Sequence, residues 1–209
     1  MNKKNKHKYS SDSADMALRL LENELGIRRE PLAKSLEQFC ALIRKWNAFA
    51  SLVSAGDEAR LWEHIADSLS LAPVVGDAGG ERPHLLDIGS GGGFPAIPLA
   101  LVFEELEAVM VERSRKKAGF LQNAVAELGL STRVAVRQED FPREGTLEGP
   151  KSWVITARAV EKPEMVWHGI LKLVEQGAVF LCQWAEVPKV ALETFHVEHI
   201  IDDWSIDGL

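Results

Sequence analysis

Four ionisable side chains lie at or near the ends of hydrophobic segments that are typical of buried strands. They are Asp87, Glu112, Glu139 and Arg158, and Asp87 leads directly into the glycine-rich stretch 89–93. Where parallel strands form a doubly wound sheet, ligands bind beyond the carboxyl ends of the strands. Glycines let the backbone pass close to a ligand and adopt positive φ. We therefore expect these side chains and the glycine turn to surround one nucleotide-binding cleft.

The glycine spacing fits two classes of nucleotide site. The first is the dinucleotide pattern G-x-G-x-x-G/A, which Gly91, Gly93 and Ala96 satisfy. Glu112 follows about 20 residues later, where an acid that binds a ribose is expected. A nicotinamide-dependent oxidoreductase is therefore one interpretation of the chain.

The second class is the acid-x-Gly-x-Gly-x-Gly loop that is typical of S-adenosylmethionine-dependent methyltransferases. Asp87, Gly89, Gly91 and Gly93 match this loop. In such enzymes the acid that ends the second strand holds the ribose hydroxyls, a role that Glu112 fits. We favour this interpretation because it accounts for Asp87 and Gly89 as well as for the later glycines.

The elements that would position these residues alternate between strand-like and helix-like segments. Strand-like runs lie at 85–89, 106–111, 133–137, 153–157 and 178–183, and helix-like runs at 96–103, 114–128 and 163–175. Ser114 is a suitable cap for the second of these helices and Gly129 a suitable stop. The alternation predicts an α/β fold with a Rossmann-like parallel sheet. The segment 199–204 could add a sixth strand.

The N-terminal part of the chain has a different pattern. Residues 1–12 are expected to form a basic flexible tail, and residues 13–82 a helical extension packed on a core of residues 83–209. We expect helices at 13–25, 31–47 and 57–71, with Asp57 capping the third, and then a connection to the first strand at 73–83. Apolar residues of the second helix recur at three- and four-residue steps and predict one buried face: Leu32, Leu36, Phe39, Ile43, Trp46 and Phe49.

The third of these helices carries polar side chains beside its apolar ones. Leu61, Ile65 and Leu69 are expected to point inward, while His64 and Asp67 lie three residues apart and could share a face. A single histidine on such a helix is interpreted as structural rather than catalytic.

Composition restricts the function classes. The chain is 46% hydrophobic and 26% charged, as globular proteins are. No apolar run approaches the roughly 20 residues of a membrane helix, so we expect a cytoplasmic protein without a membrane partner. A net charge of −7 argues against non-specific coating of nucleic acid. Cys40 and Cys182 lack Cys or His neighbours at metal-ligand spacing, so both are interpreted as core residues and no metal site is expected.

Several longer stretches carry a more specific signal. They are Trp46-Asn47 with Leu52, His64-Ile65-x-Asp67-Ser68, residues 87–100 with Pro95 and Pro98 after the glycines, Lys116-Lys117-x-x-Phe120-Leu121, Glu139-Asp140-Phe141 and Arg158-Ala159. Together they span about residues 39–160 and resemble the bacterial 16S rRNA guanine-N7 methyltransferases called RsmG or GidB.

The resemblance implies a class I methyltransferase that uses S-adenosylmethionine to methylate guanine N7 in the 16S rRNA of the small ribosomal subunit. By position, it implies cofactor contacts from Asp87, Gly89, Gly91, Gly93, Phe94, Glu112, Gln138, Glu139 and Arg158. Gln138 and Glu139 would lie beside the adenine, and Arg158 at the end shared by cofactor and substrate. Guanine N7 carries a free lone pair at neutral pH, so no general base is expected and catalysis would rest on positioning, to which Arg158 contributes.

Basic residues are the candidates for contact with rRNA phosphates. They are Arg113, Arg115, Lys116 and Lys117 beside the predicted cleft, and Lys3 and Lys4 in the tail. The target guanine must be unpaired or extruded from a helix to reach the cleft. We expect a monomer that acts on rRNA and not on DNA.

Two features depart from the family pattern. Gln183-Trp184-Ala185 stands where the family has a lysine-glycine pair after the fifth strand. No residues follow Leu209 to form the last antiparallel strand of a methyltransferase sheet, so that strand is expected to be missing. These departures keep a third interpretation open, a non-catalytic RNA-binding or assembly protein with the same fold.

Overall fold

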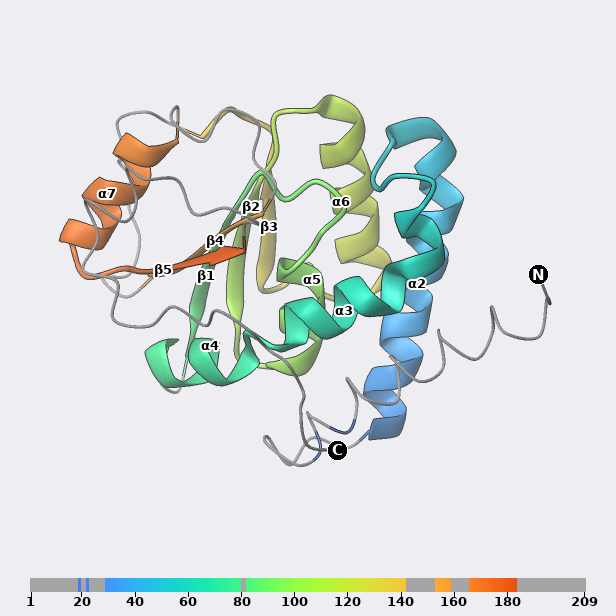
Figure 1. Ribbon diagram of the computed structural model, residues 1–209, viewed down its shortest axis with the longest axis horizontal. Coiled ribbons are helices and arrows are strands. Elements are labelled where there is room, and N and C mark those ends of the chain that lie inside the picture. The colour runs from blue at the N-terminus through green and yellow to red at the C-terminus, as the bar shows by residue number, and fades with distance from the viewer. Residues whose placement is uncertain are drawn as a thin grey trace.

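A five-stranded parallel sheet forms the centre of the described part of the chain. The computed structural model describes residues 29–79, 82–141, 153–158 and 166–183, together with Arg19 and Glu22. The strands are β1 (His84–Ile88), β2 (Glu107–Val111), β3 (Val134–Arg137), β4 (Trp153–Arg158) and β5 (Val179–Gln183). Their order is β3-β2-β1-β4-β5, and every neighbouring pair is parallel (Figure 1). The predicted Rossmann-like α/β fold is confirmed, and β1 lies between β2 and β4.

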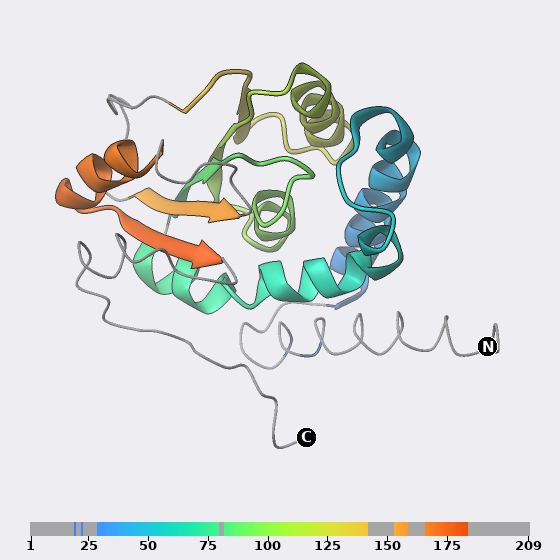
Figure 2. The same ribbon diagram turned by 45° about the horizontal axis from the view of Figure 1, so that its top comes forward.

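Helices cover both faces of this sheet. They are α2 (Arg29–Ala50), the short 3₁₀ helix η1 (Asp57–Arg60), α3 (Leu61–Leu69), α4 (Ala72–Gly79), α5 (Ala96–Val102), α6 (Arg115–Glu127) and α7 (Trp167–Glu175). Figures 1 and 2 show α7 on one side of the sheet and α2, α3, α5 and α6 on the other. Among the residues that the structure describes, no helix is long and apolar enough to cross a membrane.

Side chains that alternate along the strands separate two hydrophobic layers. Leu85 of β1 and Val154 of β4 belong to the layer shared with α2, α3, α5 and α6. Leu86 and Ile155, the next residue on each strand, belong to the layer beneath α7. Successive strand residues point to opposite faces, so a central strand with helices on both sides needs apolar residues at consecutive positions.

Helix α2 packs on the sheet side through most of its predicted apolar face. Leu36, Phe39 and Ile43 are completely buried, whereas Trp46 is half-buried and Phe49 is 60% exposed. The helix also continues to Ala50, so the predicted end at 47 was wrong. Asn47 lies inside the last turn, and its side-chain Oδ1 accepts hydrogen bonds from the backbone N–H groups of residues 52 and 53, which follow the helix.

The third predicted helix consists of two elements, η1 and α3. Leu61, Ile65 and Leu69 are buried as expected. The predicted cap was wrong, because Asp57 is the first residue of η1 and its N-cap position is occupied by Gly56, which makes no side-chain cap hydrogen bond. The Oγ of Ser54 accepts a hydrogen bond from the Asp57 backbone N–H at 3.2 Å.

The segment 73–83 was predicted as a connection, but most of it belongs to α4. Ala72 and Val75 are buried in the same layer as α3 and α5. Pro73 occupies the first turn, where a helix loses no hydrogen bond to the missing N–H. Burial of the apolar residues therefore outweighs the turn preference of Gly76 and Gly79.

The predicted strands and the helices α5 and α6 are confirmed with ends shifted by one residue at most, whereas α7 begins at Trp167 and not at 163. Gly129, the predicted stop of α6, has a φ of 70° and follows the C-cap residue 128. Cys40 is buried as expected, and burial raises the pKa of its thiol to about 12. Outside the described residues lie the tail 1–12, most of the helix predicted at 13–25, residues 163–165, the side chain of Cys182 and the possible strand 199–204, so the expected absence of a last antiparallel strand stays a prediction.

Candidate functional site

The turn after β1 has the backbone conformation that its glycines predict. Gly89, Gly91 and Gly93 have φ values of 71°, 50° and 87°, a region that side chains disfavour. A Cβ at Gly93 would also lie 2.7 Å from Ile97 Cδ1. The backbone N–H groups of Gly89 and Ser90 both donate to the carbonyl of Val111 at the end of β2, at 2.9 and 3.2 Å. The turn is therefore fixed against the neighbouring strand.

Glu112 connects this turn to the start of α6. The residue is 6% exposed, and its carboxylate accepts two backbone hydrogen bonds, from Gly91 N at 2.9 Å and from Ser114 N at 2.7 Å. Ser114 occupies the N-cap position of α6 as predicted, although its side chain makes no cap hydrogen bond. Glu112, the residue predicted to bind the ribose, therefore lies beside the glycine turn and also holds that turn in place.

Asp87 is buried beneath the turn. Thr156 of the adjacent strand β4 donates its hydroxyl to Asp87 Oδ1 at 2.8 Å, while Oδ2 is buried without a hydrogen-bond partner. Burial raises the pKa of Asp87 to about 7, the nearby charge of Glu112 adds to this rise, and the hydrogen bonds oppose it. An acid with a free buried oxygen at this point can respond to a cation placed above the turn.

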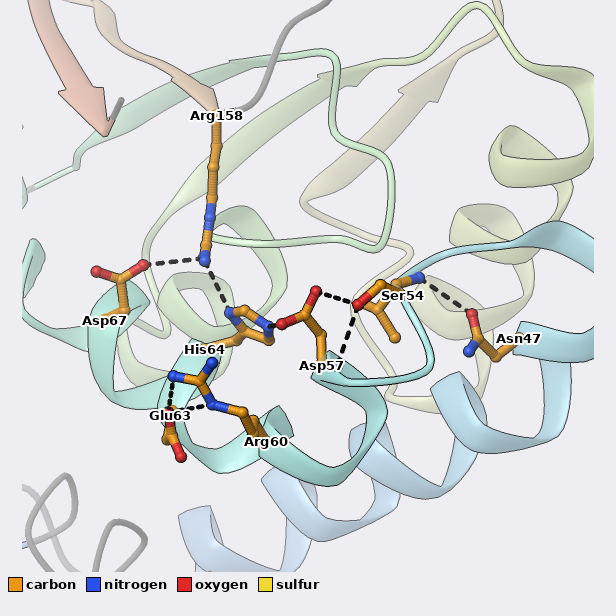
Figure 3. Close-up of polar contacts among 9 residues, drawn as sticks. Asn47, Ser54, Asp57, Arg60, Glu63, His64, Asp67 and Arg158 are labelled. Atoms are coloured by element: carbon orange, nitrogen blue, oxygen red, sulfur yellow. Dashed lines mark hydrogen bonds and ion pairs between the residues drawn. The ribbon is translucent and has the colours of Figure 1, made fainter. Parts of the chain in front are cut away.

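Arg158 lies at the carboxyl end of β4 and is held by two residues of α3. Its Nη2 lies 2.8 Å from His64 Nδ1 and its Nη1 lies 3.0 Å from Asp67 Oδ2. Figure 3 shows both contacts, with the guanidinium reaching from β4 to the helix. The sequence placed His64 and Asp67 on one helix face, but it gave no indication that Arg158 is their partner.

A further polar chain supports His64 from its other side. His64 Nε2 lies 3.6 Å from Asp57 Oδ1, and Ser54 donates its hydroxyl to Asp57 Oδ2 at 2.6 Å (Figure 3). Burial lowers the pKa of His64, as does the charge of Arg158, while Asp57 and Asp67 oppose the shift. The hydrogen bond to Ser54 lowers the pKa of Asp57. The histidine is thus kept neutral beside a permanent cation.

Phe94 joins the glycine turn to the helical layer. Its buried ring lies 5.2 Å from the ring of Phe39 and 5.6 Å from that of His64, centroid to centroid. The Arg158 guanidinium carbon is 6.0 Å from the Phe94 ring centroid. The ring of Phe94 thus has the contacts of a core residue, and the predicted cofactor contact by this residue stays a prediction.

The remaining predicted cofactor residues follow β3. Gln138 and Glu139 are exposed, and Glu139 Oε1 lies 3.9 Å from Arg137 Nη1. Because β3 is parallel to β2, both residues lie at the same edge of the sheet as Glu112. The four strand ends named at the outset are therefore neighbours in the sheet, as predicted.

The predicted RNA-binding residues lie at the start of α6, next to Glu112. Arg113, Arg115 and Lys116 are exposed and Lys117 is half-buried, whereas Lys3 and Lys4 are outside the described residues. Lys116 Nζ lies 4.8 Å from the centroid of the Phe49 ring, which the helical pattern had placed inside. An exposed ring covered by a lysine is a feature that the sequence pattern missed. Within the described ranges no group of His, Cys, Asp and Glu is arranged to hold a metal ion.

The chain matches known proteins along most of its length. The family model for GidB, rRNA small subunit methyltransferase G, matches residues 32–203. A ribosomal RNA small subunit methyltransferase G from Anaeromyxobacter dehalogenans is 36% identical over 174 residues, which cover 81% of this chain and 78% of the relative. The protein of that name from Geobacter sp. strain M21 is 36% identical over 160 residues, covering 75% and 71%.

Other relatives match over a shorter stretch. The ribosomal RNA small subunit methyltransferase G from Chromobacterium violaceum is 42% identical over 102 residues, so the alignment spans 47% of that relative's length and 48% of this chain. Among solved structures, the METTL16 MTase domain aligns with a TM-score of 0.50 and 16% identity, covering 80% of this chain and 71% of that one. At this identity the likeness shows a common fold.

Proposed function

The chain belongs to the family of rRNA small subunit methyltransferase G, and on this premise we propose that it transfers a methyl group from S-adenosylmethionine to N7 of a guanine in 16S rRNA. The small ribosomal subunit in the bacterial cytoplasm is the proposed place of action. The observation that carries the proposal is the acidic, glycine-lined carboxyl edge formed by β1, β2 and β4.

The charge of this edge favours a cationic cofactor over a dinucleotide. Asp87 and Glu112 are buried on either side of the turn, and Gly91 already donates its N–H to the Glu112 carboxylate. A pyrophosphate would need free backbone N–H groups and a positive helix terminus. At the start of α5, Pro98 has no N–H and Ile97 donates to the Gly93 carbonyl at 2.8 Å. The turn therefore offers little to an anion.

The same residues fit S-adenosylmethionine. When bound, this cofactor supplies a methyl group on a positively charged sulfonium sulfur. Glu112 would accept hydrogen bonds from the ribose, Gln138 and Glu139 would lie on the adenine side, and Asp87 would place a carboxylate beneath the turn near the cation. The free buried Oδ2 of Asp87 supports this assignment, because a buried carboxylate needs a compensating partner.

The first turn of α6 supports an RNA substrate. Arg115, Lys116 and Lys117 lie there with no acidic residue, although the helix dipole disfavours cations at an N-terminus. Phosphates would compensate this charge in the complex. Phe49 beside Lys116 offers an exposed aromatic ring, the kind of surface on which unpaired bases stack.

The chain needs no proton acceptor for the proposed step. Guanine N7 presents a lone pair at neutral pH, so the residues have to orient the base, exclude water and hold the charges in place. Arg158 is the proposed positioning residue, because it reaches the carboxyl edge from β4 and is itself held at two atoms.

Incubation with labelled S-adenosylmethionine and small subunits from cells that lack the enzyme tests the proposal. We expect label in 16S rRNA, recovered as 7-methylguanosine after digestion. Absence of that nucleoside, with the chain folded and the cofactor bound, would favour the non-catalytic RNA-binding alternative. Stabilisation by NAD and not by S-adenosylhomocysteine in a thermal-shift assay would favour the oxidoreductase.

A further inference from the structure

His64, Asp67 and Arg158 form a cluster that joins the helical extension to the sheet. The hydrogen bond between His64 and Arg158 connects residues 94 positions apart, and the ion pair between Asp67 and Arg158 is 3.0 Å long. Both α3 residues lie one helical turn apart and thus share a face. Arg158 follows Ala157, which pairs in register with Ile88 immediately before the glycine turn. The cluster therefore lies beside the turn at the central strands.

The geometry determines the protonation state of His64. A guanidinium can only donate hydrogen bonds, so Nδ1 at 2.8 Å from Arg158 Nη2 has to be the unprotonated nitrogen. The ring proton is then on Nε2, which faces Asp57 Oδ1 at 3.6 Å. Asp57 is in turn held by the hydroxyl of Ser54. These successive contacts select one neutral tautomer of His64 and fix the orientation of its ring.

The charges that face His64 come from three elements. They are Asp57 and Arg60 of η1, Asp67 of α3 and Arg158 of β4. If Nδ1 were protonated, its N–H would face the N–H of the Arg158 guanidinium, and both groups would carry a positive charge. The arrangement is therefore compatible with neutral His64 only, and it would be lost at acid pH.

We propose that His64 and Asp67 are positioning residues that hold the Arg158 guanidinium at the methyl-transfer site, so that α3 forms part of that site. The inference rests on the proposed function and goes beyond it. An arginine side chain has several rotatable bonds, and two fixed partners remove the freedom that would otherwise let it leave the edge of the sheet. Phe94 packs against both His64 and Arg158 and restricts the guanidinium on a third side.

Three variants and one matched control test the proposal. His64→Asn keeps an acceptor near the Nδ1 position but cannot titrate, His64→Ala removes the acceptor, and Asp67→Asn removes the charge. His84→Asn is the control, because His84 also pairs with an acid at 3.6 Å and packs on an aromatic ring, but at the amino end of β1. For each protein, kcat, KM and S-adenosylhomocysteine affinity are measured from pH 5.5 to 8.5, with the melting temperature.

We expect His64→Ala and Asp67→Asn to lower kcat by about tenfold or more, because small displacements of a positioning group cost that much. Wild-type kcat should fall as the pH drops below the ordinary histidine range near 6.5, whereas His64→Asn should keep part of the activity and lose this acid limb. The control should behave as wild type. An unchanged acid limb in His64→Asn, or a kcat loss matched by the control, would overturn the proposal.

One readout does not depend on turnover. In a ¹⁵N-labelled sample, the ring nitrogens of His64 should report unprotonated Nδ1 and protonated Nε2 at neutral pH. The opposite tautomer would contradict the proposed hydrogen bond whatever the activity. If the wild type binds the cofactor but methylates nothing, the proposed function fails while the tautomer and the effect of each variant on S-adenosylhomocysteine affinity still decide the role of His64 and Asp67.

Discussion

Glu112 Oε2 accepts a hydrogen bond from the Gly91 backbone N–H at 2.9 Å, so the acid at the end of β2 holds the turn at the end of β1. Its other oxygen accepts the Ser114 N–H at the start of α6. One buried carboxylate thus connects the expected cofactor turn with the basic first turn of α6. We therefore expect Glu112 to lie between the bound cofactor and the bound RNA.

Replacing Glu112 should affect both stability and cofactor binding. Glu112→Ala leaves the Gly91 and Ser114 N–H groups without this acceptor, and hydrogen bonds to a charged group contribute about 1.5–3 kcal/mol each. We expect the free energy of unfolding to fall by about 2–4 kcal/mol and S-adenosylhomocysteine affinity by about tenfold or more, with a smaller effect on RNA affinity. Denaturant titration and calorimetry measure these changes. Glu107→Ala, an exposed acid at the other end of β2, is the control, and unchanged cofactor affinity in Glu112→Ala would remove Glu112 from the site.

Asp87 should make the stability depend on pH near neutrality. Burial and the charge of Glu112 raise its folded-state pKa to about 7, above its unfolded value of about 3.9. The neutral acid therefore contributes stability that is complete below pH ~4 and is lost as the pH rises through about 7.

Comparison with Asp87→Asn isolates this contribution. The amide is always neutral and still offers Oδ1 to Thr156, so its melting temperature relative to wild type should be higher at pH 8 than at pH 5. Asp77→Asn, at an exposed position of α4, provides the baseline. A relative melting temperature for Asp87→Asn that stays constant or falls with pH would contradict the raised pKa of Asp87.

Two glycine substitutions should have opposite effects on stability. Gly93→Ala places a Cβ 2.7 Å from Ile97 Cδ1 at a φ of 87°, so we expect a loss of about 1–3 kcal/mol. Gly119→Ala, inside α6 with no atom within 4 Å of the added Cβ, should stabilise by about 0.5–1 kcal/mol. Chemical denaturation of both variants measures the difference. Equal effects would mean that the turn relaxes more easily than its packing indicates.

The start of α6 should account for part of the salt dependence of RNA binding. Lys116→Ala should weaken binding of a single-stranded rRNA fragment and reduce the slope of log K against log salt by about 1. Phe49→Ala should lower affinity with less change in slope, because stacking is not a counterion effect. Filter binding across a salt series measures both, with Lys172→Ala on α7 as the control. A slope unaffected by Lys116→Ala would place the phosphate contacts elsewhere.

Local sequence determined the strands, most helices and the type of the turn. Strand and helix periodicities depend on neighbouring residues, so β1 to β5 and the helices α5 and α6 are found almost where the pattern placed them. The positive φ values of Gly89, Gly91 and Gly93 follow from residue type in the same way. The parallel order of the strands then brings the ends of β3, β2, β1 and β4 together at one edge, as the βαβ alternation predicts.

Tertiary structure decided which side chains are partners and which are exposed. No periodic pattern relates His64 to Arg158, because their contact depends on how α3 packs against α5 and on the rotamer of a long side chain. Phe49 fits a helical apolar stripe, yet it lies beyond the surface that α2 buries and meets Lys116 instead. Helix α4 formed where turn residues predicted a connection, since burial of Ala72 and Val75 outweighs local preference. The sequence by itself thus determined the sheet edge that carries the candidate site, and packing over long separations decided how the charged side chains at that edge are held.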